Sequence, residues 1–225
     1  MEYTFRAART SGFTSLALKG EGCAVVLTQK KVPEQLMDPA TVSNLHTITP
    51  TVGCVTTGRA PDSRAQIARA RQTAHKHEYD FGYAMPVDYL ASRIAASNQT
   101  YTQQAGTRPA AVFLMFVAID DEKGPLVYKV DPAGFTASYK ATCAGDKEVE
   151  TNSALEKLYR DGDNDGAWDL DSTIKKAIST IQNVLSSDFK PTELEIGYVS
   201  VDNPEFTQLS VEDIEGYLNA IAEED

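Results

Sequence analysis

Hydrophobic and polar positions divide the chain into blocks with two different periods. From Phe13 to Thr57, short apolar strings such as TSLALKG, CAVVLTQ and VGCVTTG alternate with turns, which predicts a series of strands. From Pro61 to Gln104 the apolar residues recur at helical spacing instead. A break from Gly82 to Pro86 interrupts this block, so we expect two long helices there.

The second half repeats this order. The run AAVFLMFVAID is too apolar to have a face in water, so it predicts a strand covered on both sides. Further strands follow, separated by turns at Gly124 and Pro132, and the last third predicts two helices, a strand from Leu194 to Val201 and a final helix from Ser210. Segregated blocks of strands and helices favour an α+β fold, with stacked antiparallel sheets under helical layers.

Size, charge and cysteines limit the function. A chain of 225 residues can bury a substantial core, and we expect a single domain. The formal net charge of -11 argues against a nucleic-acid partner. Cys23, Cys54 and Cys143 lie in apolar runs and predict buried, reduced thiols, which indicates the cytosol or nucleus. No window approaches the ~18 apolar residues of a membrane span, so no membrane partner is expected.

The segment RDGDNDGAWDLD, residues 160 to 171, partly matches an EF-hand calcium loop. Aspartates stand at positions 1, 3 and 5 and glycine at position 6, but Ser172 occupies position 12, where a bidentate Glu is required. We therefore favour a loop that starts a helix, with Asp169 and Asp171 near its N-terminus, over a calcium-binding module formed by the 161–172 segment. The matching positions are Asp161, Asp163, Asp165 and Gly166.

Other candidate chemistry is sparse. His46, His75 and His77 have no nucleophile motif beside them, and we interpret them as surface residues. No phosphate-binding or dinucleotide-binding glycine pattern is present. The sequence therefore predicts no catalytic residues, no cofactor and no metal.

Several segments together resemble the proteasome α-subunit family, over essentially the whole chain. The details QKKVP and DFKP are most like the eukaryotic type-6 (α1) branch of that family. The resemblance implies a four-layer αββα sandwich of the N-terminal-nucleophile hydrolase type. The segments are TSLALKGEGCAVVLTQKKVP, TVGCVTTGRAPDSRAQIARAR, YTQQAGTRP, VYKVDPAGF, YKATCAG and FKPTELEIGYVSVDNPEF.

The same resemblance implies a non-catalytic subunit in the outer α ring of the 20S core particle, which serves ATP-dependent, ubiquitin-linked protein degradation in cytoplasm and nucleus. Its partners would be two neighbouring α-subunits, a β-subunit of the inner ring, and a regulatory particle or other activator. The domain would span 1–225. Residues 1–11 would form the α-specific N-terminal helix, with Tyr3, Phe5 and Ala8 packing on one side. The family's gating tail upstream of this helix is absent from the sequence.

Catalytic relatives in the superfamily use a free N-terminal Thr, whose own amine takes the proton from its hydroxyl. Here the corresponding stretch is Gly12-Phe13-Thr14, with a bulky residue where the nucleophile would stand. The acidic residue that supports the amine aligns with Gln29, and the activating Lys aligns with Asn44. An active N-terminal-threonine hydrolase is therefore the alternative that we disfavour.

The resemblance also points to two kinds of surface. The pocket that receives the C-terminal carboxylate of an activator corresponds to Asn44, Gly58 and Arg59. Because its Lys is missing, we expect weak docking there, with Arg59 as a partial substitute. The helices that face the β-ring carry the interface candidates Arg64, Arg69, Arg71, Tyr89 and Arg93.

Overall fold

Two antiparallel five-stranded sheets lie face to face in a computed structural model that describes residues 1–161 and 166–224. The first sheet has the order β10-β9-β2-β1-β8 and the second the order β3-β4-β5-β6-β7. The strands are β1 (Thr14–Gly20), β2 (Cys23–Gln29), β3 (Leu45–Thr49), β4 (Val52–Gly58), β5 (Val112–Asp120), β6 (Gly124–Val130), β7 (Thr136–Ser138), β8 (Ala141–Gly145), β9 (Leu194–Ser200) and β10 (Thr207–Gln208).

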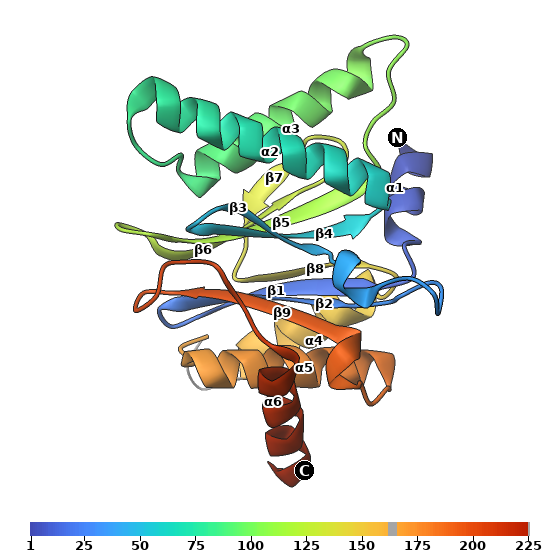
Figure 1. Cartoon of the computed structure of the whole chain (residues 1–225), viewed down its shortest axis with the longest axis vertical. Helices are drawn as coiled ribbons and strands as arrows, with labels where there is room; N and C mark the ends of the chain where they lie inside the picture. The colour runs from blue at the N-terminus through green and yellow to red at the C-terminus, as the bar shows by residue number, and fades with distance from the viewer. Residues whose placement is uncertain (162–165, 225) are drawn as a thin grey trace.

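Helices cover the outer face of each sheet (Figure 1). Helices α2 (Ala60–Phe81) and α3 (Val87–Gln103) pack on the second sheet, and α4 (Glu148–Asp161) and α5 (Leu170–Leu185) pack on the first, with α6 (Val211–Glu224) beside them. The short helix α1 (Glu2–Arg9) lies at one end of the two sheets. The predicted four-layer αββα sandwich and the predicted order of elements are both confirmed. Two 3-10 turns, Pro39–Thr41 and Pro191–Glu193, complete the elements.

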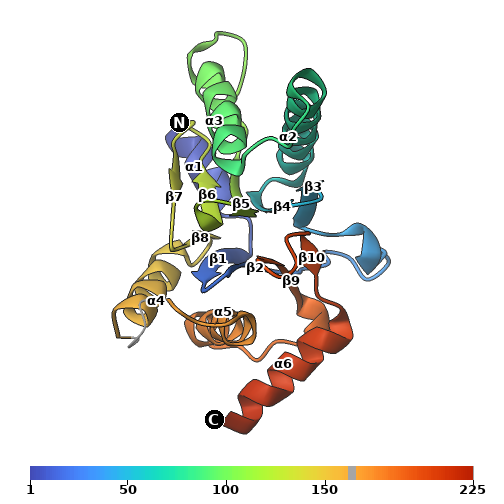
Figure 2. The same ribbon diagram turned by 90° about the vertical axis from the view of Figure 1, so that its left-hand side faces the viewer.

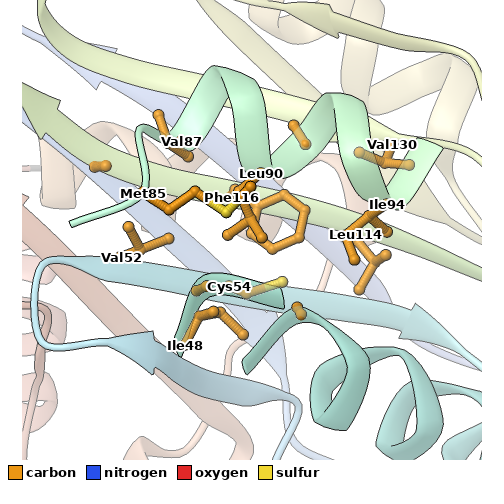
Figure 3. Close-up of a cluster of buried hydrophobic side chains, with 14 of the residues drawn as sticks. Ile48, Val52, Cys54, Met85, Val87, Leu90, Ile94, Leu114, Phe116 and Val130 are labelled. Carbon is orange, nitrogen blue, oxygen red and sulfur yellow. The ribbon is translucent and has the colours of Figure 1, made fainter. Parts of the chain in front are cut away.

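Strand β5, which lies within the run AAVFLMFVAID, is covered by packed layers on both of its faces. Leu114 and Phe116 point toward α2 and α3, where Leu90 and Ile94 meet them (Figure 3). The alternate side chains, among them Phe113, enter the core between the sheets. Because successive strand residues point to opposite faces, a strand between two packed layers must be apolar at every position.

Local signals fix the ends of the helices. Asp169 caps α5, its side chain accepting a hydrogen bond from the backbone N–H of Ser172 at 3.1 Å. Ser210 and Asp213 form a reciprocal capping pair at α6, in agreement with the helix predicted from Ser210. Gly82 ends α2 in the left-handed conformation, with φ of 80°, a region that favours glycine.

Burial of the cysteines and histidines agrees only in part with the sequence-based predictions. The cysteines are buried and free, as predicted. The prediction that all three histidines are surface residues was wrong for His77, which is 8 % exposed because the rings of Phe81, Tyr83 and Tyr89 enclose it. His46 is half-buried, and only His75 is exposed.

No helix in the described ranges is both long and apolar enough to cross a membrane.

Candidate functional site

Thr14, the first residue of β1, directly follows Phe13, the residue that corresponds to the nucleophile of the catalytic relatives. Thr14 is fully buried, and its backbone N–H donates to Oε1 of Gln29 at 2.9 Å. Its hydroxyl accepts a hydrogen bond from the backbone N–H of Lys147 at 3.4 Å. Both polar groups of Thr14 are therefore engaged inside the protein.

Neutral hydroxyl groups continue from this point across the two sheets. The Thr57 hydroxyl donates to Ser15 Oγ at 2.8 Å, and Ser15 shares a 2.7 Å hydrogen bond with Thr28. Thr28 in turn donates to the backbone carbonyl of Gln29 at 3.3 Å. These side chains are buried, and because buried hydroxyls are stable only when hydrogen-bonded, they tie β1, β2 and β4 together at this end.

Helix α1 covers the same end of the sandwich (Figure 1). Ala8 is fully buried in the core between the sheets, and the Phe5 ring lies 5.9 Å from the Phe113 ring of β5. Thus Phe5 and Ala8 pack as predicted, whereas Tyr3 is 85 % exposed and does not belong to the packed side. The helix therefore packs the apolar side chains of Phe5 and Ala8 at the end of the sandwich where β1 starts.

A chain of charges fastens the end of α1. Nε of Arg9 lies 2.8 Å from Glu148 on α4, and Nζ of Lys129 lies 2.8 Å from the other oxygen of that carboxylate. Lys129 also donates to the carbonyl of Cys143 at 2.6 Å and lies over the Phe113 ring. The carboxylate and the lysine are both largely buried, so Glu148 links α1 to α4, β6 and β8.

Sequence reasoning missed this network because its members lie far apart in the chain, 139 residues in the case of Arg9 and Glu148. It also missed an ion pair at the start of α2, in which the Asp62 side chain is buried and the Arg108 side chain is 65 % exposed. Asp62 accepts from both terminal nitrogens of Arg108, at 2.7 and 2.5 Å, and from the N–H of Ala111 at 2.8 Å. The bond from Arg108 lowers the pKa of Asp62 below its ordinary value. No sequence signal beyond an Asp in the first helical turn could have found this pair.

The residues of the expected activator pocket lie at neighbouring strand ends. The Thr56 N–H donates to the carbonyl of Asn44 at 3.0 Å, which places Asn44 two residues from Gly58 along β4. Gly58 has φ of 149°, and a Cβ there would lie 2.2 Å from the carbonyl oxygen of Ala111. The N–H of Arg59 donates to that same oxygen, and its side chain is exposed.

The backbone N–H of Asn44 is already hydrogen-bonded to a carboxylate of this chain. The Asn44 N–H donates to Oε2 of Glu195 at 3.0 Å, and the other oxygen of Glu195 lies 3.3 Å from Nζ of Lys30. Negative charge is therefore present where an incoming carboxylate would seek a donor.

Two of the predicted interface arginines make contacts within the chain. Arg69 donates to the hydroxyls of Ser97 and Tyr101, and its guanidinium lies over the Tyr101 ring, so it joins α2 to α3. Nε of Arg71 donates to the carbonyl of Thr47 at 2.9 Å and joins α2 to β3. Both contacts stabilise this subunit itself.

The other candidates are more open. Arg64 is exposed on α2, and Tyr89 and Arg93 are exposed on α3, where they border a cavity of about 350 Å³ beside His77. The role of all five residues in an interface stays a prediction.

The segment that partly matches a calcium loop, for which we favoured a helix-initiating role, is described only in part, since residues 162–165 lie outside the described ranges. Gly166 has φ of 91° and lies against Tyr159, and Asp169 and Ser172 form the start of α5, as the helix-initiating interpretation expects. Among the described residues, no three His, Cys, Asp or Glu side chains form a group that could hold a metal.

Two antiparallel five-stranded sheets between helical layers define the sandwich of the N-terminal-nucleophile hydrolase class. Residues 10–199 match the proteasome subunit family. The probable proteasome subunit alpha type-1 of Schizosaccharomyces pombe is 48% identical over 226 residues, covering 100% of this chain and 91% of the relative. The proteasome subunit alpha type-6 of Caenorhabditis elegans is 39% identical, covering 100% and 90%.

A more distant relative, the proteasome subunit alpha type-2 of Dictyostelium discoideum, is 33% identical over 97% of this chain and 90% of its own length. The chain therefore belongs to the proteasome α-subunit family, and the resemblance found in the sequence is confirmed.

Proposed function

We propose that this α-type subunit is a structural, non-catalytic component of the outer ring of the 20S proteasome, active in ubiquitin-linked protein degradation in cytoplasm and nucleus. The burial of Thr14 carries the non-catalytic part of this proposal. Its nitrogen is a backbone amide within the chain, hydrogen-bonded to Gln29, and an amide cannot serve as the base that a threonine nucleophile needs. The hydroxyl is enclosed as well.

In the described part of the chain, no charged side chain hydrogen-bonds to Thr14. Gln29 is neutral, and the nearby Lys31 donates to the Gly12 carbonyl rather than to the threonine. Asn44 replaces the lysine that would lower the pKa of a nucleophile. An active hydrolase would need cleavage before Thr14, removal of α1 and a new charge. We therefore keep it as the alternative that the experiment below is designed to exclude.

Native mass spectrometry of the tagged chain purified with its cellular partners tests the assembly. We expect a stacked-ring particle that contains this chain once per outer ring. Treatment of that particle with a peptide epoxyketone, followed by peptide mapping, tests the chemistry, because the reagent forms an adduct with an N-terminal threonine. A purely monomeric chain would contradict the ring role, and an adduct on any threonine of this chain would contradict the non-catalytic role.

We propose that two neighbouring α-subunits and one β-subunit are its partners, and that the α2–α3 layer contacts the β-subunit. Arg64, Tyr89 and Arg93 support this choice because their exposed side chains can reach a partner. Arg69 and Arg71 would act indirectly, by holding α2 in position. Exchanging Arg93 for Glu should reduce incorporation into the full particle in a competition with the unchanged chain.

We propose that activator tails dock weakly at Asn44, Gly58 and Arg59, since Glu195 places a carboxylate at the Asn44 amide. A fluorescent tail peptide titrated against the particle tests this. Asn44→Lys should strengthen binding at this pocket about tenfold, in line with one charge-assisted hydrogen bond. Unchanged binding in Asn44→Lys, or tight binding before any substitution, would show that tails do not depend on this position.

A further inference from the structure

A groove between α4 and α5 is a cavity that the proposed ring role leaves unexplained. It has a volume of about 700 Å³, within the range of about 300–1,000 Å³ that small-molecule sites occupy. Figure 2 shows the two helices adjacent to each other in the layer opposite α2 and α3. Its lining residues are Ala154, Lys157, Leu158, Trp168, Ser172, Lys175, Lys176, Ser179, Thr180 and Asn183.

The charge of this groove is opposite to that of the protein. Three lysines line it and, among the described residues, no carboxylate does, although the whole chain carries a formal charge of -11. Lys157 forms no ion pair with the described part of the chain, and the described contact of the Lys176 ammonium is with the face of Trp168, 5.2 Å from the ring centroid. Like charges in one partly enclosed groove repel each other, which an anionic ligand would relieve.

Neutral donors stand beside these lysines. Ser179 and Asn183 project from successive turns of α5, and neither side chain hydrogen-bonds to a described residue. Lysine ammonium groups with hydroxyl and amide donors suit tetrahedral phosphate better than a planar carboxylate, for which arginine gives the matching bidentate geometry. One phosphate brings a charge of about -1.5 to -2, close to that of Lys157 and Lys176 together.

We propose that the α4–α5 groove binds a small ligand that carries phosphate groups. Lys157 and Lys176 pair with the phosphates, Ser179 and Asn183 donate to their oxygens, and the apolar side of the groove at Leu158 contacts the remainder of the ligand. The volume exceeds the needs of one phosphate, so we expect a compact molecule with more than one. This site is independent of the proposed ring role, since it lies outside the candidate pocket and the α2–α3 layer.

Trp168 provides the readout, because it lines the groove and is the single tryptophan of the chain. Inositol hexakisphosphate, titrated into the full chain at low ionic strength, should change the fluorescence of Trp168 saturably, with one site by calorimetry. Inorganic phosphate should bind more weakly, and myo-inositol, which has the same ring without phosphates, should not bind. Added salt should weaken binding, because it screens the charges.

Lysine variants distinguish binding in the groove from nonspecific attraction of the anionic probe to any surface lysine. Lys157→Gln and Lys176→Gln should each weaken binding at least about tenfold, the value of one charge-assisted contact. The matched control Lys76→Gln, an exposed lysine on α2, should stay within about twofold of the unchanged chain. Thermal unfolding of each variant shows that it is folded.

No saturable signal at about 1 mM probe, which corresponds to only about 4 kcal/mol of binding free energy, would overturn the proposal. Equal losses in the Lys76 and Lys176 variants, or binding of myo-inositol, would overturn it as well. These measurements use the single chain, so their failure leaves the ring role untouched.

Discussion

Neutralising Glu148 tests whether charge holds α1 over the start of β1. In Glu148→Gln the side chain keeps its shape but loses its charge, so Lys129, with a side chain only 12 % exposed, is left without its anion. Breaking a largely buried pair of this kind costs about 2 kcal/mol, less than the full penalty for an isolated charge because Lys129 keeps the Cys143 carbonyl and the face of Phe113. The exposed half of the network, at Arg9, adds about 0.5 kcal/mol.

The chain offers a matched control on the same helix. Glu150 forms a looser pair with Lys147, at 3.6 Å, in which both side chains are about half exposed. Glu150→Gln should therefore cost less than about 0.5 kcal/mol. The two substitutions change the same net charge within three residues of each other, so general electrostatics cancels in the comparison.

Two measurements follow the loss of Glu148. The melting temperature should fall by about 4–10 °C for Glu148→Gln, at about 2–4 °C per kcal/mol for a domain of this size, and by less than about 2 °C for Glu150→Gln. Hydrogen exchange should quicken at the amides of α1 in the first variant only. Equal melting temperatures in the two variants, or unchanged exchange in α1, would refute the view that Glu148 holds α1 in place.

Two further predictions concern the core and the response to acid. Gly53→Ala should destabilise the protein by about 1–3 kcal/mol in urea unfolding, because its Cβ would lie 2.1 Å from the ring of Phe206, whereas Gly216→Ala, in open space on α6, should stabilise it by about 0.5–1 kcal/mol; the same sign for both would contradict this reasoning. Burial, aided by the charge of Arg71, lowers the pKa of His46 to about 4. Stability from neutral His46 is therefore complete above its ordinary pKa of about 6.5 and is lost as pH falls toward 4. Allowing for solvent screening, the loss should be about 1–2 kcal/mol, and His46→Gln should remove this part of the pH dependence in unfolding curves.

The elements that could be predicted from the sequence are those whose signals are local. Ile67, Ala70 and Ala74 repeat at helical spacing, and all three are buried on α2. The caps at Asp169 and Ser210 likewise depend only on residues within one turn. Such patterns predict elements and layers because burial of one face follows from periodicity alone.

The sequence predicted the candidate site only where its residues lie close together along the chain. The β3–β4 hairpin places Asn44 opposite Thr56, two residues before Gly58, but the carboxylate at the Asn44 backbone N–H comes from Glu195, 151 residues away. His77 was misassigned although its position indicates the buried face, since it follows Ala70 by seven residues and Ala74 by three. The rings of Tyr83 and Tyr89, which lie beyond the end of α2, complete its burial, and this contact depends on the tertiary fold. Contacts that depend on tertiary folding leave no periodic trace.

The start of β1 explains why this sandwich would not regain activity through one substitution. An N-terminal nucleophile needs an amine with freedom to accept a proton, and that requires an open strand end. Here the strand end is used for folding: the Thr14 N–H donates to Gln29, Ser15 is hydrogen-bonded to Thr28 and Thr57, and α1 packs at the same end against β4, β5 and β8. A charge placed among these neutral, satisfied hydroxyls would lack a partner and cost several kcal/mol. The contacts that would have to break to free Thr14 also join the two sheets, so the proposed non-catalytic role and the stability of this end of the sandwich depend on the same hydrogen bonds.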